Sequence, residues 1–203
     1  MADTGWISPG TMAEYARSSG AVWTDEDQAK TQNDDYAESG IPKTEFSTYL
    51  GASNFSFGIP SGATIVGIET RYEAYSNLYG GYVKEEIVRL HKSGTQSGDD
   101  KATGVGVRHT DDEDDTYLEH GGAADMWSSG YDYDDVTSST FGVLYAFNNT
   151  EDEFAGMAYV DHIQIKIHYT TPGYGNSVND VPSANIGSIN DVPTANIETV
   201  NDI

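Results

Sequence analysis

The chain has 203 residues, of which 33 are acidic and 10 are basic, so its formal net charge is −23, and it contains no cysteine. Disulfides and thiolate metal sites are therefore excluded, and nucleic acid is an unfavourable partner because phosphate binding needs positive charge. No apolar run approaches the roughly 18 residues of a membrane span, so no membrane partner is expected, and the opening MADTGWISPGT lacks the basic and apolar regions of a signal peptide. Fourteen tyrosines, six phenylalanines and three tryptophans nevertheless predict a folded chain.

The distribution of charge indicates the conditions in which the protein works. Between Arg108 and Lys166 there is no Lys or Arg, whereas 14 Asp and Glu fall in that interval. One explanation is adaptation to concentrated salt, where screening over about 3 Å suppresses repulsion between carboxylates. The other explanation is specific binding of divalent cations. Because the acidic residues are spread over the whole chain, we favour salt adaptation and a halophilic host.

In chain order, the first half gives few regular patterns. Residues 11–20 and 26–39 have the composition of a helical turn or two, without an apolar stripe, and residues 55–59 are a short strand candidate. Residues 61–75 start with a Pro-Ser-Gly turn and then alternate as a strand does. The residues predicted to face inward in this strand are Val66, Ile68, Thr70 and Tyr72.

The second half alternates more clearly. Residues 85–94 predict a strand that ends at a Ser-Gly turn, residues 104–110 a shorter one, and residues 141–147 a strand with alternating aromatic and aliphatic residues. Residues 159–171 predict a half-buried strand with one face in water. On its polar face are His162, Gln164, Lys166 and His168, where solvated histidines are expected.

Many short strands with turn signals and almost no helix predict an all-β fold, namely an antiparallel β-sandwich of jelly-roll-like type. We expect this domain to span residues 1–171. Residues 172–176 are rich in Pro and Gly and predict a linker. The remaining residues, 177–203, form a short repeat extension.

The extension contains two and a half copies of an eleven-residue unit, SVNDVPSANIG. Such units need about three or more copies to bury their apolar faces, so the tail is expected to be completed by other chains, with a homotrimer preferred. The alternative is a disordered tag left by repeat expansion. The residues predicted to mediate oligomerisation or docking are Val178, Val181, Ile186, Ile189, Val192, Ile197, Val200 and Ile203.

The acidic run between His109 and His120 is the candidate metal site. Its candidate ligands for calcium or magnesium are Asp111, Asp112, Asp114 and Asp115. The run departs from an EF-hand, because Thr116 stands where that loop needs glycine. No cofactor is expected to be required, and a solvated acidic loop is the simpler interpretation. The acidic stretch 132–135 is interpreted in the same way.

No catalytic arrangement is recognisable, so a non-enzymatic protein is expected. The serines lack a nucleophile-elbow sequence and partner His and Asp residues, and with 33 carboxylates no single pair stands out. Trp6, Trp23 and Trp127 have the chemistry of a sugar-stacking platform, but core positions are the more common place for tryptophan in a small sandwich. Asn54 and Asn148 begin glycosylation sequons.

Three stretches carry a family resemblance: IPSGATIVGIETRYEA, MWSSGYDYDDVTSSTFGVLYAF and AYVDHIQIKIHYTT. Together they resemble a β-sandwich module of structural proteins from tailed bacterial and archaeal viruses, over residues 55–171. The repeats resemble tails appended to virion and surface proteins. The resemblance implies no active-site residues.

The resemblance implies a virion structural protein displayed on the particle surface, as a capsid decoration, turret, tail fibre or spike, and extracellular after release. Its expected partners are further copies of itself, other virion proteins, and a host-surface glycan or S-layer. The alternative function is a carbohydrate- or surface-binding module of an extracellular adhesin or filament.

Overall fold

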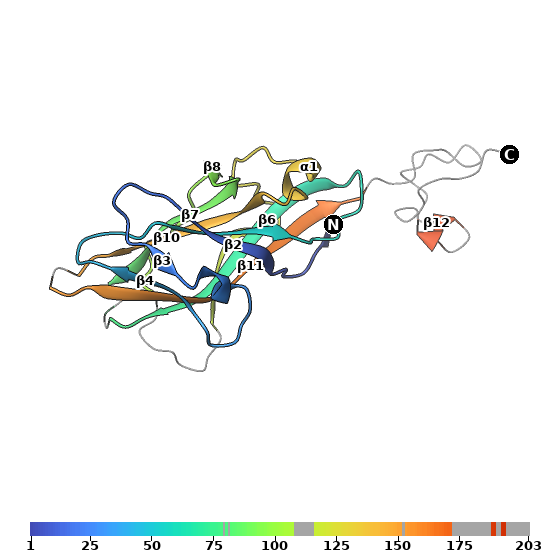
Figure 1. Ribbon diagram of the computed structural model, residues 1–203. Helices are drawn as coiled ribbons and strands as arrows, with labels where there is room; N and C mark the ends of the chain where they lie inside the picture. Colours follow the sequence, from blue (N-terminus) through green and yellow to red (C-terminus); the bar gives the residue numbers. More distant parts are fainter. Residues whose placement is uncertain are drawn as a thin grey trace.

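The computed structural model is an antiparallel β-sandwich whose two sheets pack over one hydrophobic core (Figure 1). This confirms the predicted fold class. The residues that the structure describes are 1–78, 80, 82–107, 116–151, 153–171, 188–189 and 192–193. None of the helices among them is long and apolar enough to cross a membrane.

The first sheet is built around the long strand β11. In order across the sheet its strands are β3 (Trp23–Thr24), β4 (Ala37–Ile41), β11 (Gly156–Thr170), β6 (Thr64–Ser76) and β9 (Tyr117–Gly122), and β1 (Ala2–Asp3) also pairs with β11. All pairings are antiparallel. We call this layer sheet A.

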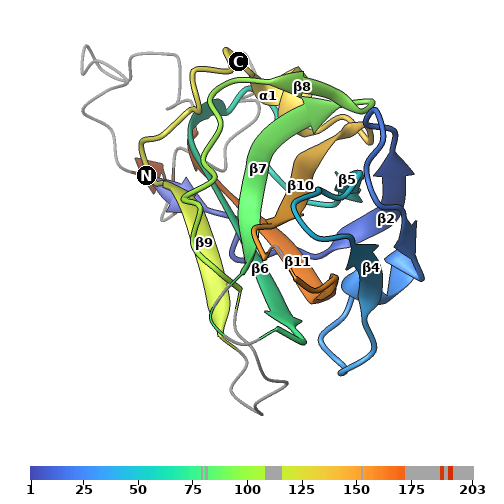
Figure 2. The ribbon, with the colours of Figure 1, turned by 90° about the vertical axis from the view of Figure 1, so that its left-hand side faces the viewer.

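The second layer, sheet B, is built around β10. In order its strands are β2 (Pro9–Tyr15), β5 (Tyr49–Phe55), β10 (Phe141–Asn149), β7 (Val83–Lys92) and β8 (Thr95–Ser97). Figure 2 shows the two layers, with β9, β6, β11 and β4 in one and β7, β10, β5 and β2 in the other. The strands from β4 to β11 have the order β4-β11-β6-β9 and β5-β10-β7-β8, which is that of a jelly roll.

The core forms where the inward faces of the sheets meet. Phe141, Val143, Tyr145 and Phe147 of β10 are all buried, as their alternation predicts. Ile68, Thr70 and Tyr72 of β6 are buried as well, whereas Val66 is only half-buried. The prediction for Val66 was wrong because the pairing of β6 with β11 has a bulge there. His168 pairs with Gly67 and Tyr169 pairs with Ile65, so Val66 is skipped and the alternation of inward-facing residues shifts by one.

The first and last strands of the sandwich, β1 and β11, meet at one end of the molecule. Ala2 pairs with Tyr169, and Thr64 pairs with Thr170, so β1, the start of β6 and the end of β11 share one end of the molecule (Figure 1). We call it the terminal end. At the opposite end, which we call the loop end, Thr150 N–H donates to the Tyr82 carbonyl.

The early segments differ from their predictions. Residues 11–20 are not helical, because Pro9–Tyr15 forms β2. Residues 26–39 contain the 3₁₀-helix η1 (Glu26–Ala29) and then enter β4, so the predicted helical turn is confirmed only at its start. A further short helix, α1 (Tyr133–Val136), was not predicted.

Two short strand predictions are confirmed only in part. Of residues 55–59 only Phe55 is in a strand, the last residue of β5. In the described part of 104–110, Gly106 makes a single bridge to Lys84. By contrast, the strand predicted over 85–94 is β7, and it ends before Ser93 and Gly94 as expected.

The polar face of β11 is not solvated, because side chains of other segments contact its histidines: Ser8 and Tyr117 contact His162, and Glu69 contacts His168. Ile7 bridges to Ile165, and Ser8 Oγ lies 2.8 Å from His162 Nε2. His162 and His168 are therefore only 7% and 8% exposed, and the prediction of solvated histidines was wrong.

In the repeat extension the structure describes one small sheet. Strands β12 (Ser188–Ile189) and β13 (Val192–Pro193) pair antiparallel, on either side in sequence of an Asn-Asp turn signal. The other residues of 177–203, including the remaining predicted docking positions, lie outside the described residues.

Candidate functional site

The candidate site is a pocket at the terminal end of the sandwich, and its first wall is the turn that starts β6. Ala63 N–H donates to the Pro60 carbonyl over 3.2 Å, which closes the turn. Gly62 has φ of 75°, a left-handed conformation that favours glycine. The Pro-Ser-Gly sequence therefore fixes Ser61 and Thr64 beside the entry to the strand.

The second wall is the start of α1. Asp132 caps this helix, since its carboxylate accepts from Asp135 N–H and the Asp135 carboxylate accepts from Asp132 N–H. Tyr131, just before the cap, packs edge-on against the core residue Phe141 with ring centroids 5.5 Å apart. The cap therefore positions the two tyrosines Tyr131 and Tyr133 on either side of Asp132.

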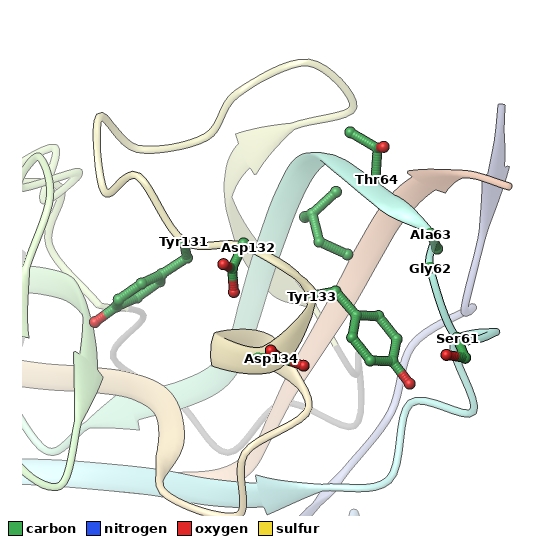
Figure 3. Close-up of a pocket in the computed structure, with 9 residues that line it drawn as sticks. Ser61, Gly62, Ala63, Thr64, Tyr131, Asp132, Tyr133 and Asp134 are labelled. Carbon is green, nitrogen blue, oxygen red and sulfur yellow. The ribbon is translucent and has the colours of Figure 1, made fainter. Parts of the chain in front are cut away.

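Between these walls lies an open pocket of about 500 Å³, within the size range of small-molecule sites. Figure 3 shows the Tyr133 ring directed toward Ser61, and the Tyr131 ring directed away from that turn. The pocket is lined by Ser61, Gly62, Ala63, Thr64, Ile65, Tyr131, Asp132, Tyr133 and Asp134. It offers the Tyr133 ring, hydroxyls and carboxylates in one place.

The carboxylates around the pocket differ in their availability. Asp135 pairs with Lys92, and this hydrogen bond is the main cause of its lowered pKa. Asp132 is engaged in the helix cap. Asp134 is exposed and makes no hydrogen bond or ion pair to another residue that the structure describes. The pocket therefore suits a ligand with hydroxyl donors and an apolar face.

A metal site does not form here or elsewhere in the described part of the chain, where no group of three His, Asp or Glu side chains is placed to hold an ion. The predicted cation ligands Asp111, Asp112, Asp114 and Asp115 lie outside the described residues, as does His109.

A second polar cluster is buried between the sheets. Glu85 of β7 accepts hydrogen bonds from Tyr72 and His120 at 2.7 Å each, and from the backbone and hydroxyl of Thr103. Burial opposes ionisation of Glu85, but the hydrogen bonds from His120 and Thr103 outweigh it and lower its pKa to about 2. Because the Glu85 side chain is fully buried, this cluster joins the sheets and does not meet a solute.

The three tryptophans do not form a sugar platform, so that hypothesis was wrong. Trp23 and Trp127 are core residues with 3% and 0% exposure, and their indole N–H groups donate to the carbonyls of Thr48 and Ile68. Trp6 lies apart from them on the outer face of sheet A. Its ring is 4.4 Å from the Arg71 guanidinium and 4.3 Å from Lys166 Nζ.

The predicted site residues therefore do not coincide with the pocket. Its tyrosines belong to GYDYDD, which by sequence was interpreted only as an acidic loop. The signal that identifies it is the alternation of aromatic and acidic residues in front of a short capped helix.

No protein-family model matches the chain, and no curated protein sequence matches it. Two solved structures are similar in fold, each with a TM-score of 0.40 and with 13% and 14% identity. One is a crystal structure of a fragment comprising domains CD, and the other was determined with a xylogluco-oligosaccharide. The alignments cover 80% of this chain but only 66% and 38% of those chains.

Proposed function

We propose that this protein is a non-enzymatic structural component displayed on the surface of a tailed-virus particle. The observation that carries the proposal is the pairing of Ala2 with Tyr169. It brings the first and last strands of the sandwich together at the terminal end. The repeat extension continues from that same end. A domain attached there leaves its sheet faces and its loop end open to the surroundings.

The loop end has side chains suited to contact. Tyr82, Val105 and Phe154 are 41%, 47% and 61% exposed, and Tyr82 lies beside Thr150 through a backbone hydrogen bond. The position of these three side chains opposite the terminal end supports a role in display.

Localisation provides the test. Antibodies raised against the sandwich should label virus particles purified from lysates of cells that carry the gene, and the chain should appear among the structural proteins of those particles by mass spectrometry. Recovery only from the particle-free fraction would contradict the proposal. Incubation with polysaccharides and peptides should release no product, since a non-enzymatic role predicts no turnover.

The second candidate function is carbohydrate binding by a module of an extracellular adhesin or filament. The specific observation in its favour is the pocket lined by Tyr131 and Tyr133, because a tyrosine ring packs on the C–H face of a sugar while hydroxyls and carboxylates bond its OH groups. Replacing Tyr133→Ala should abolish binding on a saccharide array. Unchanged binding of the Tyr133→Ala variant on the array would exclude this pocket as the carbohydrate site.

A further inference from the structure

A second groove, of about 470 Å³, lies on the outer face of sheet B. Four separate stretches of the chain build it: β2, β5, the turn after β7 and the segment after α1. It is lined by Thr11, Tyr15, Ser53, Asn54, Ser93, Ser139 and Thr140. None of these belongs to the Tyr131–Tyr133 pocket, so what binds in one does not depend on the other.

The aromatic ring of this groove is held in a fixed position. A Cβ at Gly51 would lie 2.4 Å from one edge of the Tyr15 ring, and a Cβ at Gly94 would lie 2.3 Å from the other edge. Only glycine leaves room at both places. His91 supports the ring in an edge-on contact with centroids 5.3 Å apart. Tyr15 is therefore pre-organised, which lowers the entropic cost of binding to it.

The support beneath the ring carries no charge. His91 is fully buried; its Nδ1 accepts from Gly94 N–H, so Nε2 carries the proton and faces the Ala52 carbonyl. Burial lowers the pKa of His91 to about 4, so the imidazole is neutral near pH 7. A cationic support would attract anions, and this one does not.

The polar side chains of the groove are available for a ligand. Among the residues that the structure describes, the hydroxyls of Ser53, Ser93 and Ser139 have no hydrogen-bond partner, and the same holds for Thr11 and the Asn54 amide. Ser53 is only 7% exposed and lies in the floor, whereas Asn54 lies at the rim. Hydroxyls and an amide both donate and accept hydrogen bonds.

The composition of the groove selects the ligand class. About a fifth of the chain, 21%, is charged, yet none of the seven lining residues is. Anionic ligands are repelled by the net charge of −23, and a cation finds no carboxylate among the lining residues. Apolar peptide side chains would leave the hydroxyls unpaired, which costs free energy.

We propose that this groove binds a neutral saccharide. The Tyr15 ring packs against the C–H face of one sugar unit, and Ser53, Asn54 and Ser139 form hydrogen bonds with its hydroxyl groups. A ring together with several neutral donors and acceptors matches a sugar, which is apolar on its faces and polar around its edge. The groove is separate from the first pocket, with which it shares no lining residue.

The test is a titration of the full chain followed by ¹H–¹⁵N NMR. The protein is produced in a host without N-glycosylation, so that Asn54 carries no sugar of its own. The probes are cellohexaose, xylohexaose, mannohexaose and chitohexaose, with hexagalacturonate as the anionic control. At least one neutral probe should shift the amides of Gly51, Gly94 and Ser139, and hexagalacturonate should not.

Matched variants separate the two sites. Tyr15→Leu should weaken binding in the groove about tenfold, while Tyr15→Phe retains it. Ser53→Ala and Ser139→Ala, which leave the ring in place, should each weaken it several-fold. Tyr133→Ala should leave the groove shifts unchanged, and it tests the first pocket independently.

Three results would overturn the proposal: no shift of the groove amides with any neutral probe at about 10 mM, shifts confined to the Ser61 and Tyr133 region, or equal affinities for wild type and a folded Tyr15→Leu. The second of these results would refute the groove while leaving the first pocket as a carbohydrate site.

Discussion

The phenol of Tyr72 in sheet A donates a 2.7 Å hydrogen bond to the carboxylate of Glu85 in sheet B. Both residues are buried, with 0% and 2% exposure. This contact, together with those of His120 and Thr103, makes a polar connection through an otherwise apolar core. Burying a carboxylate is costly, and the cost is offset here because four groups donate to it.

The first prediction concerns this connection. Tyr72→Phe should lower the free energy of unfolding by about 2 kcal/mol, because the bond it removes is to a charged acceptor. Glu85→Ala should cost about 3 to 5 kcal/mol, since it leaves Tyr72, His120 and Thr103 without an acceptor. Urea unfolding at pH 7 measures both. Tyr133→Phe, at an open position, is the control, and equal destabilisation by Tyr72→Phe and Tyr133→Phe would refute the role of the contact.

The second prediction is a loss of stability in mild acid caused by His91. Its pKa is about 4 in the folded chain against 6.5 when unperturbed, so between these values the unfolded state binds more protons. The contribution of neutral His91 to the free energy of unfolding is complete above pH 6.5. As the pH falls to 4, about 3 kcal/mol of this contribution is lost. His91→Gln should flatten the unfolding free energy over this window. Parallel pH profiles for the variant and wild type would contradict it.

Glu85 contributes in a lower pH window that overlaps that of His91 only between about pH 4 and 4.5. Its folded pKa of about 2 lies below the ordinary value of 4.5, so its contribution is complete above pH 4.5 and is lost as the pH falls toward 2.

The third prediction concerns the N-terminal segment. Trp6→Ala should destabilise the protein by about 2 kcal/mol, because it removes the contacts of the indole with both Arg71 and Lys166. Trp6→Phe should recover part of the loss. Val22, which is 60% exposed, gives the matched control Val22→Ala. Coincident urea transitions for Trp6→Ala and Val22→Ala would show that the contacts of Trp6 add nothing to stability.

The strands of the second half could be predicted from sequence because one face of each is apolar. Phe141, Val143, Tyr145 and Phe147 alternate without interruption, and the same period brings Ile163, Ile165 and Ile167 inward. By contrast, β2 is an edge strand in which only Pro9 and Met12 are buried, so its sequence carries no clear alternation and was not recognised.

The sites were harder to predict because they depend on contacts between distant residues. His162 contacts Ser8, 154 positions away, and the donors to Glu85 come from three other parts of the chain. The groove around Tyr15 likewise depends on Gly51 and Gly94, whose role is visible only once the strands are paired. Local sequence patterns carry no information on such juxtapositions.

The fourth prediction is salt dependence. Among the nine basic residues that the structure describes, seven pair with carboxylates, as in Arg17–Glu86 and Lys101–Asp125, but the 33 acidic residues of the chain far outnumber its 10 basic ones. The mutual repulsion of the acidic side chains weakens as salt shortens the screening length to about 3 Å at 1 M. The Tm should therefore rise from dilute buffer to molar potassium chloride. A Tm that stays constant over this range would contradict adaptation to a halophilic host.

The most direct test of assembly through the C-terminal repeats, on which the proposed attachment depends, is the mass of the oligomer that the full chain forms. Light scattering at matched high salt should give the full chain a mass of three times 22.0 kDa, and residues 1–171 alone the mass of one folded chain. The repeats have too few apolar positions, such as Val181 and Ile186, to form a core within one chain. We therefore expect these positions to be buried between chains. The same number of chains per particle for both proteins would contradict assembly through the repeats.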